Sequence, residues 1–290
     1  MAETVLHHFF ETARRHPEKT AVRFCRKLVG QGNLPSDNWL SLTWGQYKQL
    51  VESLAAGLQT GGVRKGGRVA ILSSTRLEWA ALDLAILGLG AVTVPIYPSS
   101  TPEDVAFILQ DSQARTFIVE NEDTFLKIKP AIAHLLPQIK VILVETPTTP
   151  TPLTTLDLLQ QSGEIALKTS PTLMELATKE LSLDDIATII YTSGTTGRPK
   201  GVIHTHQQAI SEVSEAFPLL GVSSNDTTLT FLPFAHVLGR IEIWGHAVIG
   251  YTMGFAESID RIKQGFQAIR PTILIAVPRI FEKIHAGILA

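Results

Sequence analysis

Residues 191–201 read Tyr-Thr-Ser-Gly-Thr-Thr-Gly-Arg-Pro-Lys-Gly. Glycine exposes its backbone amide and adopts positive φ without strain, so successive N–H groups can converge on an anion. The hydroxyl groups offer further hydrogen bonds, and Lys200 adds a positive point charge. This composition predicts a phosphate-binding loop, and its alternative is a plain surface turn.

The order of proline and lysine separates this loop from the Walker A type. In a Walker A loop, Gly-Lys-Ser/Thr runs directly into a helix, whereas here Pro199 precedes Lys200 and Gly201 follows it. An apolar run over 186–192 predicts a buried strand that enters the loop, and residues 202–205 predict a short returning strand. Thr205 and Gln208 have capping-box spacing for the next helix. Ordered elements on both sides favour phosphate binding over a plain turn.

The composition bounds the class of protein. The chain has 290 residues, of which 44% are hydrophobic and 18% charged, with a formal net charge of −2. Such a chain can bury the core of one large or two modest domains. Without basic blocks it has no cationic face for nucleic acid, so nucleic acid is not an expected partner. The single cysteine, Cys25, is expected in a strand as a core residue of a reducing compartment.

The first 21 residues carry charges throughout, so they do not form a signal peptide, and we expect the protein in the cytosol. The longest apolar run, 79–96, is interrupted by Asp83, Gly88, Gly90 and Pro95. We therefore interpret it as a core helix and strand, not as a membrane span.

Helical and strand patterns alternate along most of the chain. Capping signals at Thr43, Thr75 and Thr101 begin three of the helices. Strands separated by helices of this length pair in parallel through right-handed crossovers, which predicts an α/β fold of layered parallel-sheet subdomains. Residues 145–152 are rich in proline and threonine, so they either mark a subdomain break or form a surface loop. Strands are expected at 20–25, 68–72, 91–96, 115–120, 140–144, 227–232, 252–255 and 272–277.

Two polar pairs are candidates for metal binding. His204 and His206 lie two apart, which on a strand would place both imidazoles on one face. They straddle a strand-to-helix junction with no further ligand in place, so we predict no metal site there. Asp184 and Asp185 are expected to form a solvated turn before the strand that enters the loop.

His236 is the remaining chemical candidate. It follows the strand expected at 227–232, and ligands bind at the carboxyl ends of strands in open α/β sheets. Arg240 and Trp244 lie one turn apart on the next predicted helix and are weaker candidates for lining a pocket.

The loop resembles the signature of the adenylate-forming (AMP-binding) superfamily, Thr-Ser-Gly-Thr-Thr-Gly-x-Pro-Lys-Gly, at every fixed position. Segments 94–98, 184–190, 232–240 and 277–284 are similar to the long-chain fatty acyl-CoA synthetase branch. The resemblance implies that ATP and a fatty acid form an acyl-adenylate, from which coenzyme A then displaces AMP. It assigns the β- and γ-phosphates of ATP to Thr192, Ser193, Gly194, Thr195, Thr196, Gly197 and Lys200.

The same resemblance makes Lys200 and His236 the catalytic candidates, with His236 beside the acyl carboxylate. Arg198 occupies the motif's variable position and receives no role. In the family, the adenine-binding segment, the acidic residue that holds Mg2+ and the C-terminal domain with its catalytic lysine lie downstream, and none is found before Ala290. We therefore expect residues 1–290 to be an incomplete N-terminal AMP-binding domain, without the C-terminal lid domain and inactive alone.

Two alternatives stay open at this point. The chain could be a non-catalytic module that binds nucleotide or acyl groups, or an adenylating ligase that loads a carrier protein instead of coenzyme A. Acyl chain length, oligomeric state and peripheral contact with a membrane are also left open by the sequence.

Overall fold

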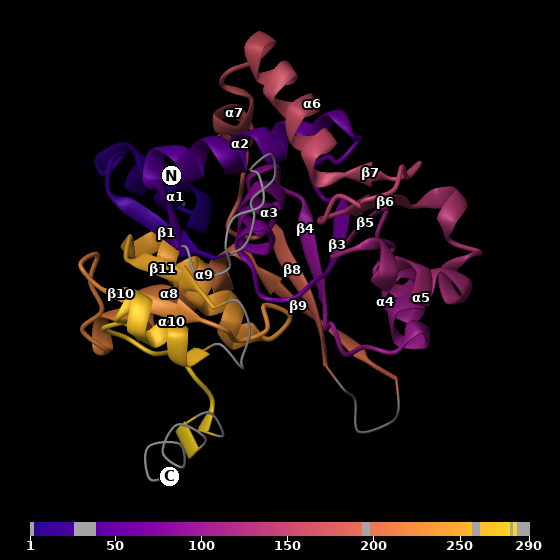
Figure 1. Ribbon diagram of the computed structural model, residues 1–290. Coiled ribbons are helices and arrows are strands. Elements are labelled where there is room, and N and C mark those ends of the chain that lie inside the picture. The colour runs from indigo at the N-terminus through magenta and orange to yellow at the C-terminus, as the bar shows by residue number, and fades with distance from the viewer. Residues whose placement is uncertain (1–2, 26–38, 193–197, 257–261, 279–280, 283–290) are drawn as a thin grey trace.

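The computed structural model describes residues 3–25, 39–192, 198–256, 262–278 and 281–282 (Figure 1). Two sheets organise them. The larger has seven strands in the order β7-β6-β5-β3-β4-β8-β9, and the smaller has four in the order β10-β11-β1-β2. Pairing is parallel except at one edge of each sheet, where β8–β9 and β1–β2 are antiparallel. The expected α/β class with layered parallel sheets is confirmed.

The strands of the larger sheet are short and mostly buried. In order along the chain they are β3 (Arg68–Leu72), β4 (Val92–Ile96), β5 (Thr116–Val119), β6 (Lys140–Leu143), β7 (Thr154–Thr155), β8 (Ile186–Thr192) and β9 (Lys200–Thr205). Residues 145–152 connect β6 to β7, which are neighbours in this one sheet. The smaller sheet contains β1 (Thr20–Phe24), β2 (Leu40–Thr43), β10 (Thr227–Thr230) and β11 (Thr252–Phe255).

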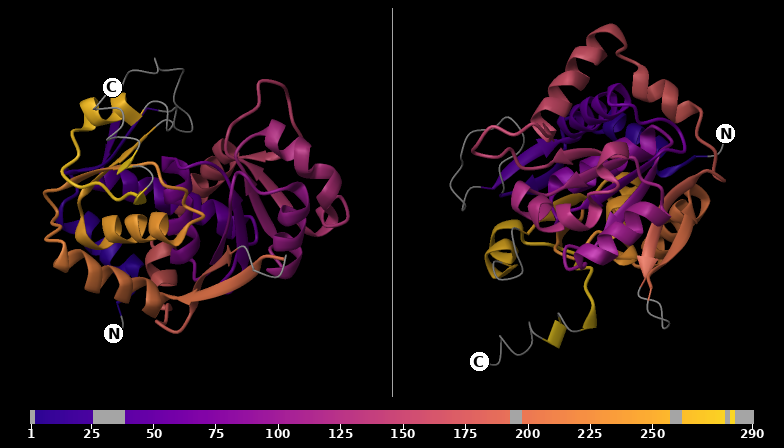
Figure 2. Two further views of the ribbon diagram at one scale, coloured as in Figure 1. Left: turned by 90° about the horizontal axis from the view of Figure 1, so that it is seen from below. Right: turned by 90° about the vertical axis from the view of Figure 1, so that its right-hand side faces the viewer.

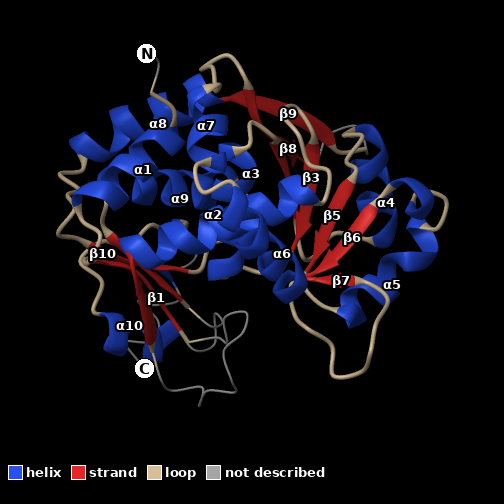
Figure 3. Ribbon diagram, turned by 90° about the horizontal axis from the view of Figure 1, so that it is seen from above, coloured by secondary structure: helices blue, strands red, loops and turns tan. Residues whose placement is uncertain are grey.

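Alternation along the strands shows how the layers stack. In β3, Val69 and Ile71 face a core shared with the smaller sheet, whereas Ala70 and Leu72 face a second core beneath α4 and α5. The shared core is filled by a central layer of helices, which Figure 3 shows between the two sheets. The central layer contains α1 (Val5–Arg15), α2 (Trp44–Thr60), α3 (Leu77–Gly88), α8 (His206–Leu219) and α9 (Val237–Ile249).

Outer helices cover the remaining faces. A third core lies between α10 (Ile262–Ile269) and the smaller sheet. Helices α4 (Pro102–Asp111) and α5 (Glu122–Ile132) cover the far face of the larger sheet, and the short turn η1 (Leu136–Gln138) follows them. Helix α6 (Leu156–Thr169) packs across α2, and α7 (Leu173–Lys179) follows it.

Local capping signals locate three helix starts correctly. Thr43 and Thr205 each form a complete capping box with the glutamine three residues on, and Thr101 accepts a bond from Asp104 N with proline at the first turn. The cap expected at Thr75 is wrong. Arg76 is the N-cap residue of α3, and the Thr75 hydroxyl donates instead to Leu232 O over 2.6 Å.

The strand expected at 272–277 is also wrong in extent. Only an isolated parallel bridge between Thr228 and Ile273 forms there. Thr272 turns its hydroxyl back to Asp226, 2.7 Å away, so its side chain caps a turn instead of extending a ladder. Of the segment 277–284, residues 279–280 and 283–284 lie outside the described residues.

Candidate functional site

The two strands that flank the phosphate-loop motif form a β-hairpin. Strands β8 and β9 pair antiparallel from Ile186 opposite Thr205 to Thr192 opposite Lys200, the last pair before the tip (Figure 2). Thr192 and Lys200 are both exposed. The predicted ligands Ser193, Gly194, Thr195, Thr196 and Gly197 lie outside the described residues. The hairpin therefore brings two of the seven predicted phosphate ligands together at its Thr192–Lys200 end, which we call the hairpin mouth.

A pocket of about 810 Å3 opens beside this mouth. Its walls come from the carboxyl ends of β4 and β8, one face of β9, the start of α9 and one side of α8 and α4. Among them are Thr192, Pro199 and His236. The phosphate hairpin and the predicted substrate-side histidine, 44 residues apart in the sequence, thus face one cavity.

His236 is held by the helix that it begins. It is the N-cap residue of α9, and its Nδ1 accepts a hydrogen bond from Leu238 N over 3.2 Å. With Nδ1 as the acceptor, the neutral ring carries its proton on Nε2. The exposed imidazole therefore offers an N–H donor to an anionic group in the pocket.

Lys200 shares a face of β9 with pocket residues. Side chains alternate along a strand, so Lys200 lies on the same face as Val202 and His204, both of which line the pocket. Its position opposite Thr192 places an ammonium group at the rim. Lysine acts on phosphate as a mobile point charge. This arrangement suits a polyanion at the rim and a substrate in the pocket behind it.

Two wall residues carry polar atoms with incomplete hydrogen bonding. His204 Nδ1 lies 3.8 Å from Glu212 Oε1, too far for a hydrogen bond, and within the described part of the chain neither His204 Nδ1 nor Glu212 Oε2 has a partner. Burial raises the pKa of Glu212, and the nearby His204 opposes that shift. His206 is fully buried at the start of α8, so the two histidines lie on different elements and in different surroundings.

Arg240 and Trp244 do not line the pocket, so that prediction is wrong. Both are completely buried. Arg240 bonds to Asp83 Oδ1 over 2.8 Å and to Thr188 Oγ1 over 3.1 Å. Burial raises the pKa of Asp83 and lowers that of Arg240, and the attraction between them opposes both shifts. The pair is an internal ion pair between α3 and α9.

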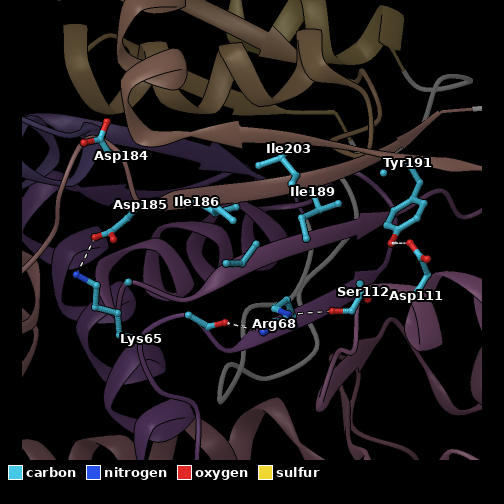
Figure 4. A pocket seen from close by; sticks show the side chains of 14 residues that line it. Lys65, Arg68, Asp111, Ser112, Asp184, Asp185, Ile186, Ile189, Tyr191 and Ile203 are labelled. Atoms are coloured by element: carbon cyan, nitrogen blue, oxygen red, sulfur yellow. Dashed lines mark hydrogen bonds and ion pairs between the residues drawn. The ribbon is translucent and has the colours of Figure 1, made fainter.

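A second pocket, of about 630 Å3, lies on the opposite face of the hairpin, where Gly201 and Ile203 line it (Figure 4). Several of its polar groups are already paired. Lys65 contacts Asp185 over 2.7 Å, and Tyr191 donates to Asp111 over 2.6 Å. Asp184 is exposed in the expected turn, where Asp185 also accepts from Ser182 N.

Sequence reasoning missed several wall residues of the first pocket. Tyr97 follows the carboxyl end of β4, so the strand-end rule that selected His236 would have found it as well. Glu212 lies on α8, 11 residues after the motif, and Asp104 lies on α4, far before it in sequence. Their place in the pocket follows only from how α8 and α4 pack beside the hairpin.

Comparison with known proteins fits this geometry. The family model described as "AMP-binding enzyme" matches residues 9–289. The chain belongs to this family. Its relatives include the long-chain-fatty-acid--CoA ligase FadD15 of Mycobacterium tuberculosis, 36% identical over 85% of this chain. Peroxisomal long chain acyl-CoA synthetase 7 of Arabidopsis thaliana is 28% identical over 90% of this chain.

Solved structures of the family share this fold. The N-terminal domain of FACL13 from Mycobacterium tuberculosis superposes with a TM-score of 0.75 at 27% identity, over 97% of this chain and 64% of that one. A long-chain-fatty-acid-CoA ligase, FadD1 of Archaeoglobus fulgidus, gives 0.76 at 20% identity, over 93% of this chain and 50% of that one. The likeness to FadD1 shows the fold alone.

The chain spans about 40% of the length of the two FadD15 relatives. Both of these relatives carry the name long-chain-fatty-acid--CoA ligase. Over the described ranges, no helix is both long and apolar enough to cross a lipid bilayer.

Proposed function

We propose that this chain supplies the phosphate-binding hairpin and acyl-side pocket of a long-chain fatty acid–coenzyme A ligase that acts in the cytosol. The observation that carries the proposal is the single cavity shared by the phosphate hairpin and His236. The substrates are ATP, a long-chain fatty acid and coenzyme A. The fatty acid class and the thiol acceptor come from the names of the relatives.

In the first half-reaction, a carboxylate oxygen of the fatty acid bonds to the α-phosphorus, and the bond from that phosphorus to pyrophosphate breaks. Catalysis of such transfers is mainly positioning and charge stabilisation. Lys200 and Thr192 hold the departing pyrophosphate at the hairpin mouth. His236 donates from Nε2 to the acid and holds its carboxylate in line with the α-phosphorus.

In the second half-reaction, the sulfur of coenzyme A bonds to the acyl carbon, and the bond from that carbon to AMP breaks. The thiol proton passes to solvent. Lys200 has less to do in this step, because pyrophosphate has left. We therefore assign Lys200 to the adenylation step and His236 to both steps, since the acyl carbonyl stays beside it.

Mg2+ is expected with ATP in this family, but the residues described near the hairpin do not fit a dedicated metal site. Within those residues, no group of three or more His, Cys, Asp and Glu side chains is placed to hold a metal ion. By the family resemblance, the acidic residue that holds Mg2+ lies downstream of Ala290, so no step is assigned to a metal here.

Calorimetry with ATP tests the proposal on the chain as it is. We expect wild type to bind ATP, and Lys200→Ala to bind it about tenfold to a hundredfold more weakly, because a charge-assisted hydrogen bond contributes about 1.5–3 kcal/mol. Lys65→Ala, in the second pocket, is the matched control and should bind like wild type. Equal affinities of Lys200→Ala and wild type would contradict the proposal.

Activity separates the ligase from a binding module. We expect residues 1–290 alone to give no palmitate-dependent exchange of pyrophosphate into ATP. In a longer protein that contains them, Lys200→Ala should slow single-turnover adenylation more than thioester formation. Tight binding of ATP and palmitate without exchange, in every longer form, would favour the non-catalytic module instead.

A further inference from the structure

Arg240 belongs to a closed ring of buried hydrogen bonds that joins four elements. Its guanidinium donates to Asp83 on α3 and to Thr188 on β8. Thr188 Oγ1 donates in turn to Thr93 O on β4 over 2.7 Å, and Thr93 Oγ1 donates to Asp83 Oδ1 over 2.7 Å. All four residues are completely buried. Figure 1 shows α3, α9 and β8 near the middle of the molecule, where this ring lies.

Two tryptophan rings lie within cation–π distance of the guanidinium. The Arg240 Cζ atom lies 5.3 Å from the Trp79 ring centroid and 5.0 Å from the Trp244 ring centroid. Arginine combines such stacking with directed hydrogen bonds, which lysine does not reproduce. The side chain is therefore held in one orientation by both its rings and its hydrogen-bond partners.

A buried ion pair is weak evidence for stability, because well-packed apolar residues often serve as well or better. Its directed bonds do fix how the joined elements lie relative to one another. Three of the four joined elements, β4, β8 and α9, contribute to the wall of the first pocket. Strand β4 leads to Tyr97, β8 leads to Thr192, and α9 begins at His236.

The ring is close to the pocket along each element. Thr188 lies four residues before Thr192, about 13 Å along an extended strand. Arg240 lies four residues after His236, about one turn of helix, or 6 Å. A slip of α9 against β8 would therefore move His236 relative to the hairpin mouth.

We propose that Arg240 is a positioning residue, which holds α9 against β8 and β4 so that His236 faces the phosphate hairpin at the correct separation. This inference rests on the proposed function for its substrate, but the positioning itself can be measured without one. The binding of ATP alone depends on the hairpin, whereas an acyl-adenylate has lost the β- and γ-phosphates and presents its acyl carbonyl to His236.

Hydrogen exchange by mass spectrometry tests the positioning in the ligand-free chain. Arg240→Met removes the guanidinium and its hydrogen bonds and keeps an apolar side chain of similar length. We expect faster exchange in peptides that cover 186–192 and 232–240, with α5 unchanged. Thr188→Val keeps the shape of the side chain and the Asp83–Arg240 pair but removes the link to β8, so it serves where Arg240→Met fails to fold. A folded variant with wild-type exchange in both peptides would overturn the proposal.

Binding of a non-hydrolysable palmitoyl-adenylate analogue tests the consequence. We expect Arg240→Met, or Thr188→Val, to keep wild-type affinity for ATP and to bind the analogue about tenfold more weakly. His236→Ala should do the same, and the double variant should lose no more than His236→Ala alone, because both changes remove one interaction. Losses that multiply would show that the ring acts apart from His236 and would overturn the proposal. If wild type bound no analogue, the proposed function would fail, and the exchange result would still decide the positioning.

Discussion

The two faces of the β8–β9 hairpin carry two pockets of similar volume and different chemistry. On one face, Val202 and His204 line a pocket of about 810 Å3. On the other, Gly201 and Ile203 line one of about 630 Å3. Because side chains alternate along β9, neighbouring residues of this one strand line different pockets.

The difference lies in how the polar groups are satisfied. In the second pocket, Lys65 is paired with Asp185 and the Tyr191 hydroxyl with Asp111. In the first, the His204–Glu212 pair is too long for a hydrogen bond. Polar groups that are hydrogen-bonded to one another stabilise the fold. Polar groups beside a cavity that lack hydrogen-bond partners are those that can bind a ligand. Volume alone would not have distinguished the two.

The largest expected effect comes from the buried Asp83–Arg240 ion pair. Asp83→Ala leaves Arg240 buried without its charge partner, so we expect a loss of about 3–5 kcal/mol in the free energy of unfolding. Urea denaturation followed by tryptophan fluorescence measures it. Glu103→Ala, an exposed change on α4, is the control. A loss below about 1 kcal/mol would mean that solvent reaches Arg240, and the ion pair would then not hold α3 and α9 together.

The next effect is a pH dependence from Glu242, which lies in α9 behind the first pocket. Burial raises its pKa from 4.5 to about 7, although the Thr230 hydroxyl, 2.8 Å away, opposes the shift. A raised pKa means that the folded state binds the proton more tightly. The stability from Glu242 is therefore complete below pH 4.5 and is lost as the pH rises through 7.

We expect the free energy of unfolding of wild type, relative to that of Glu242→Gln, to fall by about 3 kcal/mol between pH 4.5 and pH 8. Burial lowers the pKa of His246 to about 3 and that of His206 to about 4. Each of these shifts lowers the free energy of unfolding of the protein on acidification. Those losses occur in both proteins and cancel in the difference. Urea midpoints across this pH range measure it, and a constant difference would show that Glu242 keeps an ordinary pKa.

Much of this fold could be predicted from the sequence, because its signals are local. Thr43, Thr101 and Thr205 each begin a helix through bonds to residues three positions on. Thr75 has the same pattern, but its hydroxyl bonds to Leu232, 157 residues away. No local pattern contains such a partner, so the prediction of a cap at Thr75 could not have been corrected from sequence.

The candidate site divides in the same way. The strand-end rule finds His236, and it could have found Tyr97, since both positions depend only on where a strand stops. The spacing of Arg240 and Trp244 predicts that they share a helix face but not what covers that face. Their burial depends on α3 and β8, so sequence reasoning placed them in a pocket when they lie in the core.

A smaller effect is expected at His236. His236→Ala removes the hydrogen-bond acceptor that caps α9, and loss of an N-cap lowers stability by about 1 kcal/mol. His236→Asn restores a capping side chain without the imidazole, so stability should recover while affinity for the palmitoyl-adenylate analogue should not. Thermal unfolding and calorimetry on both variants measure the two effects. Recovery of both properties in His236→Asn would show that the histidine acts as a cap and not through the pocket.

The smallest effect belongs to the second pocket. Lys65 is about half exposed, and Asp185 is partly exposed. Burial would raise the pKa of Asp185, but the bonds from Lys65 and from Ser182 N, together with the charge of Lys65, outweigh it and the pKa is lowered. Exposed ion pairs contribute about 0.2–1 kcal/mol, so Lys65→Ala should change stability by no more than that. Because Lys65 has no proposed role in ATP binding, the Lys65→Ala variant should bind ATP with wild-type affinity. If Lys65→Ala weakened ATP binding as much as Lys200→Ala, the two faces of the hairpin would be one site, and the contrast between satisfied and unsatisfied polar groups would not identify the functional pocket.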